Sequence, residues 1–256
     1  MTTLVVSSLD LRAARPLRLA AEKRGWKVMD FDKARRRTLR GPIVVYSGTD
    51  WVDAICRNLS ITLDEPAWDL LARLPYGLRL RHVEMTTAEA LNHYSKRQFI
   101  KPADPRRRVF DAGVYESYER IPRRELFAEN FPILVSEPVE FVAEYRLFIV
   151  GARIAASSPY MLSGRPIWKP FGSGGKPADV KQLLGGFVLR LNAACESLLP
   201  GAYVVDVGLI EGRGWAVVEF NPVWCSGILG AKPDDVLNAL QAAVISTPRT
   251  TYPPEV

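Results

Sequence analysis

The chain has 256 residues, of which 34 are basic and 28 acidic, giving a formal net charge of +6. Its 48% hydrophobic content allows a sizeable core and argues against global disorder. The charge is typical of an Arg-rich soluble protein, or of a protein whose partner is a nucleotide, an acidic substrate or nucleic acid, and charge alone does not choose among them.

The three cysteines are Cys56, Cys195 and Cys225, which are far apart and lack a Cys-x-x-Cys spacing. We expect reduced thiols in a cytoplasmic protein, rather than disulfides or a zinc site. The chain has two histidines, too few to favour a His-rich metal site. The apolar run at residues 4–7 is too short for a signal peptide, and no apolar run approaches the length of a membrane span.

The first 60 residues predict strands alternating with helices. The predicted strands cover residues 4–7, 27–31 and 43–46, and the predicted helices cover residues 10–24 and 51–58. This order favours a small parallel α/β unit. No Gly-x-Gly-x-x-Gly motif is present, so a classical dinucleotide site has no support.

The rest of the chain mixes helices and strands. Helices are predicted over residues 65–74, from a capping box at Thr86-x-x-Glu89 to about residue 94, over residues 180–198, and from Pro233 onward. Strands are predicted over residues 99–101, 133–141, 145–150 and 153–158. The Pro/Thr-rich tail from Thr247 is expected to be loose.

A β-hairpin is predicted over residues 203–222, with its turn centred between Gly212 and Arg213. This register places Asp206 opposite Glu219 at about 5 Å between Cβ atoms, with Asn221 on the same face. Facing acids destabilise a strand pair unless a cation lies between them, and three oxygen ligands suit Mg²⁺. The alternative is a half-exposed hairpin with unrelated polar residues on one face. The opposite face is predicted to be apolar, with Tyr203, Val205, Val207, Leu209, Ala216, Val218 and Phe220.

Three further patterns have a possible chemical role. Lys101 ends an apolar strand, where it could reach a phosphate or simply keep a strand edge soluble. Glu144 and Arg146 share one strand face, as a surface ion pair or as a site where the arginine neutralises a phosphoryl group. A proline interrupts the strand over residues 133–141, which is typical of a hinge or of an edge strand.

Two loops are candidates for contacts with an anion. Residues 103–113 are basic and irregular. Residues 171–176 read Phe-Gly-Ser-Gly-Gly-Lys, without the spacing of a P-loop, and we interpret this segment as a lid. The lid would belong to a longer loop over residues 161–176, in which Arg165 and Lys169 are candidates for binding an anionic substrate. A plain surface connector is the alternative.

In this order, these motifs resemble the ATP-grasp superfamily, and most closely its compact bacterial RimK-like members. The resemblance covers about residues 84–245: the strand lysine Lys101, a hinge strand, Glu144-Tyr-Arg146, Asp206, and Glu219-Phe-Asn221-Pro. It implies a mixed α/β (α+β) fold, in which an ATP-grasp domain follows a small N-terminal α/β domain. We expect the N-terminal domain over residues 1–83, the ATP-grasp domain over 84–246, with subdomains 84–140 and 141–246, and a tail over 247–256.

The resemblance also implies roles for individual residues. Lys101 would hold the phosphates of ATP. Ser136, Glu137 and Val139 would contact adenine, with Glu144 near the ribose. Arg146 would face the γ-phosphate and the reacting carboxylate, and Asp206, Glu219 and Asn221 would bind Mg²⁺. The family's second nucleotide lysine has no clear counterpart, and Arg73 or Arg81 could replace it; Arg81 is also a candidate substrate residue.

The implied activity is that of an ATP- and Mg²⁺-dependent carboxylate–amine ligase, which forms an amide through an acylphosphate. Its partners would be small-molecule or peptide acids and amines, with no membrane. One alternative is an ATP-binding regulatory module without ligase activity, since glycines are few after Lys101. Another is a nucleic-acid binder, suggested by Arg35-Arg-Arg37 and Arg106-Arg-Arg108, but no reading motif accompanies these runs.

Overall fold

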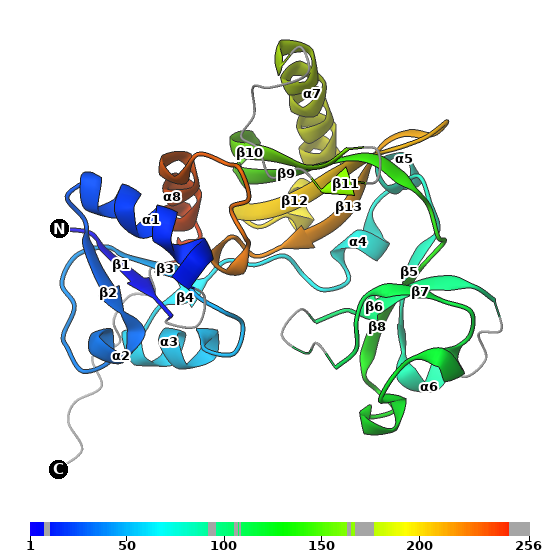
Figure 1. The fold of residues 1–256 in the computed structure, drawn as a ribbon, viewed down its shortest axis with the longest axis horizontal. Coiled ribbons are helices and arrows are strands. Elements are labelled where there is room, and N and C mark those ends of the chain that lie inside the picture. Colours follow the sequence, from blue (N-terminus) through cyan, green and yellow to red (C-terminus); the bar gives the residue numbers. More distant parts are fainter. Residues whose placement is uncertain are drawn as a thin grey trace.

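The described part of the chain forms four β-sheets. The computed structural model describes residues 1–7, 11–91, 96–104, 107, 109–162, 165–166 and 177–245. The strand orders are β2-β1-β3, β14-β4, β5-β8-β6-β7 and β11-β10-β9-β12-β13. The three-stranded sheet lies at one end of the molecule and the four-stranded sheet at the other (Figure 1).

The N-terminal unit is the parallel α/β unit predicted from the sequence. Its strands are β1 (Thr3–Val6), β2 (Lys27–Asp30) and β3 (Ile43–Tyr46), and β1 is parallel to both neighbours. The helices that alternate with them are α1 (Leu11–Lys23), α2 (Phe31–Ala34) and α3 (Val52–Leu59). Leu4, Val5 and Val6 are buried because a central parallel strand is covered on both faces.

The linker after this unit is mostly irregular, and the helix predicted over residues 65–74 is wrong. The linker contains β4 (Thr62–Leu63), α4 (Leu70–Arg73) and α5 (Tyr76–Arg79). Prolines at positions 66 and 75 disfavour helical angles at the preceding residues. Leu74 accordingly has an extended conformation, with ψ at 145°. β4 pairs with β14 (Val244–Ile245), so the end of the described chain returns to the N-terminal unit.

The small sheet is antiparallel. Its strands are β5 (Val83–Thr87), β6 (Gln98–Pro102), β7 (Gly113–Tyr115) and β8 (Pro132–Ser136). The helix predicted from a cap at Thr86 starts later, because β5 continues through Thr87 and α6 covers Ala88–Leu91. The Thr87 hydroxyl accepts a hydrogen bond from the backbone N–H of Ala90 (3.4 Å), so Thr87 caps this helix.

The large sheet is antiparallel and forms the centre of the molecule. Its strands are β9 (Phe141–Val150), β10 (Arg153–Leu162), β11 (Arg165–Pro166), β12 (Ala202–Ile210) and β13 (Gly214–Asn221). α7 (Pro177–Cys195) packs on one face with Leu147 and Val205, while α8 (Pro233–Ala242) packs with α1 on the other face, against Phe148 and Val204. The single strand predicted over residues 133–141 is two strands, and residues 137–140 connect the small sheet to the large one.

The hairpin of β12 and β13 has the predicted Asp206–Glu219 pair, but not the predicted turn. Residues 211–213 form a three-residue turn, and the pairing is Ile210 with Gly214 and Val207 with Val217. The register then shifts by one residue at Val218, which restores Asp206 opposite Glu219. The prediction of Ala216 and Val218 on the apolar face is therefore wrong, because Trp215 and Val217 pack there instead.

Short 3-10 helices complete the described elements: η1 (Tyr118–Arg120), η2 (Arg124–Leu126), η3 (Glu196–Leu198) and η4 (Val223–Cys225). Within the described ranges, no helix is sufficiently long and apolar to cross a membrane.

Candidate functional site

A row of polar side chains crosses four strands of the large sheet. Ser158 on β10 pairs with Arg146 on β9, Arg146 pairs with Asp206 on β12, and Asp206 pairs with Glu219 on β13. Side chains alternate along a strand, so these positions face away from the apolar layer under α7. The register therefore alternates acids with an arginine, in residues that lie far apart in the sequence.

Arg146 and Asp206 form a bidentate ion pair. The Arg146 Nε donates to Asp206 Oδ1 (2.9 Å) and Nη2 donates to Oδ2 (2.7 Å). The Asp206 side chain is 1% exposed and that of Arg146 is 15% exposed. A buried carboxylate needs such a partner, because its desolvation is costly. Arg146 also lies 3.8 Å from Glu219 Oε1, so it lies between the two acids as the sequence analysis requires of a cation.

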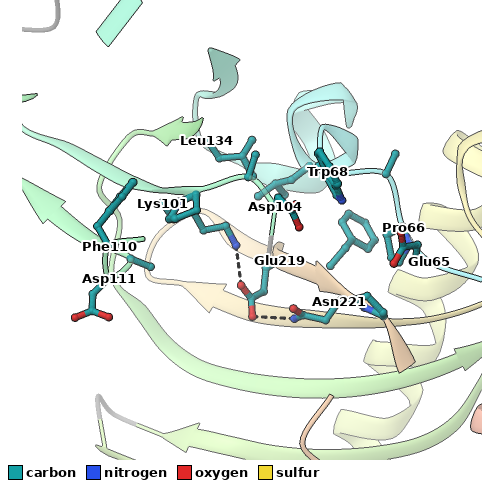
Figure 2. A pocket seen from close by; sticks show the side chains of 17 residues that line it. Glu65, Pro66, Trp68, Lys101, Asp104, Phe110, Asp111, Leu134, Glu219 and Asn221 are labelled. Carbon is teal, nitrogen blue, oxygen red and sulfur yellow. Dashed lines mark hydrogen bonds and ion pairs between the residues drawn. The ribbon is translucent and has the colours of Figure 1, made fainter. Parts of the chain in front are cut away.

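Lys101 and Asn221 hold the other carboxylate of the row. The Lys101 ammonium donates to Glu219 Oε2 (2.7 Å), and the Asn221 amide donates to Oε1 (2.9 Å), as Figure 2 shows. Lys101 belongs to β6 of the small sheet and Glu219 to β13 of the large sheet. This ion pair therefore joins the two sheets across the space between them.

The surroundings separate the pKa values of the two acids. Burial raises the pKa of Asp206 to about 6, an effect that the Arg146 hydrogen bonds only partly offset. For Glu219, burial acts in the same direction, but the Lys101 charge and the Asn221 hydrogen bond outweigh it and lower the pKa to about 2. Glu219 is therefore the fully ionised member of the pair at neutral pH.

Glu144 and Arg146 share one face of β9, as predicted, and both contact Tyr160 of β10. The Tyr160 hydroxyl donates a hydrogen bond to Glu144 Oε2, and the Arg146 guanidinium lies 5.9 Å from the Tyr160 ring centroid. Burial raises the pKa of Glu144 and that of the Tyr160 phenol, so the phenol remains a donor. The sequence analysis missed Tyr160, because it ended the strand before Pro159, whereas β10 continues to Leu162.

The predicted adenine-binding residues lie at the connection between β8 and β9. Ser136 is buried at the end of β8, and Val139 is half-buried in the connection. Glu137 accepts a hydrogen bond from Arg213 (2.7 Å), and its backbone N–H donates to the carbonyl of His82 (2.9 Å). The Arg213 contact lowers the pKa of Glu137. The adenine-binding assignment stays a prediction for these three residues.

A cavity of about 260 Å³ opens beside Lys101, Glu219 and Asn221. It lies between β6 of the small sheet, β13 of the large sheet and the linker that contains Trp68 (Figure 2). Three further carboxylates line it: Glu65, Asp104 and Asp111. Sequence reasoning missed these three acids, because nothing in their local pattern shows that the linker and the loop after β6 meet at one place.

The three candidate substrate residues lie in different environments. Arg81 is buried, and its guanidinium donates to the backbone carbonyls of Val217 and Val218 of β13. These contacts correct the sequence-based role, since the guanidinium is directed at β13 rather than at a substrate. Arg165 is exposed on β11. Lys169 and most of the predicted lid lie outside the described residues.

The donor set at the end of the hairpin suits a hard cation only in part. Among the residues that the structure describes, no group of three or more His, Cys, Asp or Glu side chains could hold a metal. Asp206 and Glu219 offer carboxylate oxygens, and Asn221 keeps its amide oxygen free of the bond to Glu219. Mg²⁺ prefers a few such oxygens together with phosphate and water ligands. These three residues therefore fit Mg²⁺ that arrives with a nucleotide.

Comparisons with known proteins agree with the resemblance noted in the sequence. A family model described as an ATP-grasp domain, the second family of its clade, matches residues 78–239, more than half of the chain. No curated protein matches the sequence.

Solved structures share the fold over almost the whole chain. A RimK domain ATP-grasp protein from Sphaerobacter thermophilus has 16% identity and a TM-score of 0.54, covering 94% of this chain and 98% of its own. The D-cycloserine synthetase DcsG has 15% identity, the same TM-score and the same coverage. The ATP-grasp ligase PsnB, complexed with a minimal precursor, Mg and ADP, has 12% identity and a TM-score of 0.53, covering 94% of this chain and 98% of its own. At these identities the likeness shows a shared fold.

Proposed function

Because the chain belongs to the ATP-grasp family, we propose that it is an ATP-dependent carboxylate–amine ligase that requires Mg²⁺. The observation that carries the proposal is the row of Arg146, Asp206 and Glu219, which ends at Lys101 beside the cavity. Two acids and two cations at the junction of two sheets are suited to holding a metal and a polyphosphate at the same time. The related structures named as ligases agree with this proposal.

The side chains act by position and by charge. When bound, ATP with Mg²⁺ supplies the γ-phosphoryl group that converts a substrate carboxylate into an acylphosphate, which an amine then attacks to give an amide and phosphate. Lys101 turns from Glu219 to the nucleotide phosphates, which frees the Glu219 oxygens for the metal. Arg146, held by Asp206, neutralises the oxygens of the transferring group. No nucleophilic side chain is needed, because the carboxylate and the amine react once they are oriented.

The nucleotide would lie between the small and the large sheet. Lys101 of β6 marks its phosphate end, and the connection at Ser136, Glu137 and Val139 marks its adenine end. Glu144 would contact the ribose, and Asp206, Glu219 and Asn221 would hold Mg²⁺. Arg165 and Lys169 would lie on the acid-accepting side, with the loop over residues 161–176 as its cover.

The test is an activity screen. Purified protein is incubated with ATP, Mg²⁺ and pools of carboxylic acids and amines, including peptides, while ADP release and new amide masses are measured. The proposal requires ADP release that depends on both an acid and an amine, with one new amide per ADP.

A second function is an ATP-binding module without ligase activity. It is favoured by the small number of glycines after Lys101, where Gly113 stands alone in the described loop. Saturable ADP binding with Mg²⁺, but no acid- and amine-dependent ADP release over broad pools, would favour this module over the ligase.

A further inference from the structure

We infer that Arg81 is a positioning residue, which keeps Glu219 opposite Asp206 by holding the β-bulge at Val218. The inference deepens the proposed function, and one of its two tests rests on nucleotide binding. The contacts between Arg81 and the bulge are independent of any ligand.

The position of Glu219 depends on a single extra residue in β13. On the turn side of the bulge, Val207 pairs with Val217, and continuing that register would pair Asp206 with Val218. Glu219 would then pair with Val205, which packs in the apolar layer under α7. The bulge moves the chain by one residue, so Glu219 joins the row instead. Val217 and Phe220 both pack toward the apolar layer, as expected when one residue is inserted between them.

Arg81 binds the backbone on both sides of this extra residue. Its Nη1 donates to the carbonyl of Val217 (2.7 Å), and its Nη2 donates to the carbonyl of Val218 (3.0 Å). Successive carbonyls of a regular strand point in opposite directions, so one guanidinium reaches both only where the strand is bulged. The planar fork of arginine matches two neighbouring acceptors, which the single ammonium of lysine cannot do.

The setting of Arg81 is costly unless these bonds are made. The residue is 4% exposed, and burial lowers its pKa to about 10. A buried cation is tolerated when its donors are paired, and Nη1 also donates to the carbonyl of Arg79 (3.1 Å). The guanidinium lies 5.3 Å from the ring centroid of Phe141, at the start of β9. Arg81 therefore fixes the linker before β5 to the bulged strand.

The neighbouring Arg79 provides a matched control. It is in the same linker and also donates to backbone carbonyls, but these belong to Ala72 and Val83 and neither bond reaches β13. Arg79→Met should therefore destabilise the linker without changing the register of β13. Arg81→Met removes the contacts to the bulge, and Arg81→Lys keeps the charge but not the fork.

The first measurement is amide hydrogen exchange of β13 in the nucleotide-free protein, followed by mass spectrometry. We expect faster exchange over residues 215–221 in Arg81→Met and Arg81→Lys, but not in Arg79→Met at matched overall stability. Equal exchange of β13 in all three variants would overturn the inference. This readout decides the role of Arg81 even if the protein binds no nucleotide.

The second measurement is the affinity for ADP with Mg²⁺ and with EDTA. In Arg81→Met, ADP binding in EDTA should be unchanged, while the tightening by Mg²⁺ falls about 10- to 100-fold, as for other residues that orient a metal ligand. A tightening like that of wild type would overturn the positioning role. If wild type binds no ADP at all, the proposed function fails, and the exchange measurement alone decides on Arg81.

Discussion

At the scale of single residues, Glu219 has the most connected position in the site. It accepts hydrogen bonds from Lys101 and Asn221, lies near Arg146, and faces Asp206 across the strand pair. Each contact comes from a different segment of the chain. A change of charge at Glu219 therefore alters the balance of the whole row, and a change at Lys101 alters only its phosphate end.

We predict that Glu219→Gln abolishes acid- and amine-dependent ADP release while the protein stays folded. The amide keeps the shape of the side chain but lacks the negative charge that a divalent cation requires. Steady-state ADP release and a melting curve together check this outcome. Glu211→Gln, at the exposed tip of the same hairpin, is the matched control and should retain activity. Activity at the wild-type level in Glu219→Gln would remove this residue from the metal site.

We predict that Lys101→Ala weakens ADP binding by about tenfold or more, because a charge-assisted contact to a phosphate is lost from a partly enclosed site. Calorimetric titration with ADP measures the effect. Lys96→Ala removes an exposed lysine shortly before the same strand and should leave the affinity unchanged. Equal affinities in all three proteins would place the nucleotide elsewhere.

At the scale of elements, the large sheet is closely packed against the linker, and α7 has unfilled space on its surface. A Cβ added to Gly208 in β12 would lie 2.4 Å from Cδ1 of Phe141, whereas one added to Gly185 in α7 would meet nothing within 4 Å. The two glycines therefore have different reasons to be glycine. Gly208 makes room for the ring beside Arg81, and Gly185 has no packing partner in the described chain.

These two glycines give opposite predictions for stability. Gly208→Ala should lower the free energy of unfolding by about 1–3 kcal/mol, the usual cost of overpacking. Gly185→Ala should raise it by about 0.5–1 kcal/mol, because alanine is the better helix former and its methyl group has room. Chemical denaturation of both variants against wild type measures the difference. The same sign of change in both would contradict this account of the packing.

At the scale of the whole molecule, the small and the large sheet are joined by contacts of unequal strength. Lys101–Glu219 and the Arg81 bonds to β13 are shielded from solvent, whereas the Arg213–Glu137 ion pair (2.7 Å) is exposed on both sides. Arg213 also donates to the carbonyl of Leu80 (3.0 Å). The hairpin tip thus contacts both connections between the sheets.

We predict that Arg213→Ala has a small effect on ADP affinity, about two- to fivefold at low salt, because exposed ion pairs contribute little and are screened. Titrations at low and high ionic strength measure this change, and the deficit should shrink at high salt. A loss as large as that of Lys101→Ala would show that the exposed contact sets the distance between the sheets.

Much of the architecture was predictable because it is recorded in local pattern. The alternation at residues 4–46 predicted the parallel unit, and the acidic pair in the hairpin was placed correctly. The spacing of Lys101, Arg146, Asp206 and Glu219 also indicated the family. These features depend on side-chain periodicity and on residue type, which a sequence displays directly.

Other features were decided only by tertiary structure. The bulge at Val218 could not be predicted, because a three-residue turn and a bulge cancel each other and leave the same Asp206–Glu219 pair. Tyr160, Glu65 and Asp104 belong to segments that meet only after the sheets pack. Arg81 looked like a ligand-binding cation, yet its bonds go to the carbonyls of β13. The partners of a polar side chain depend on which backbone groups the fold brings within reach, and no local pattern records that distance.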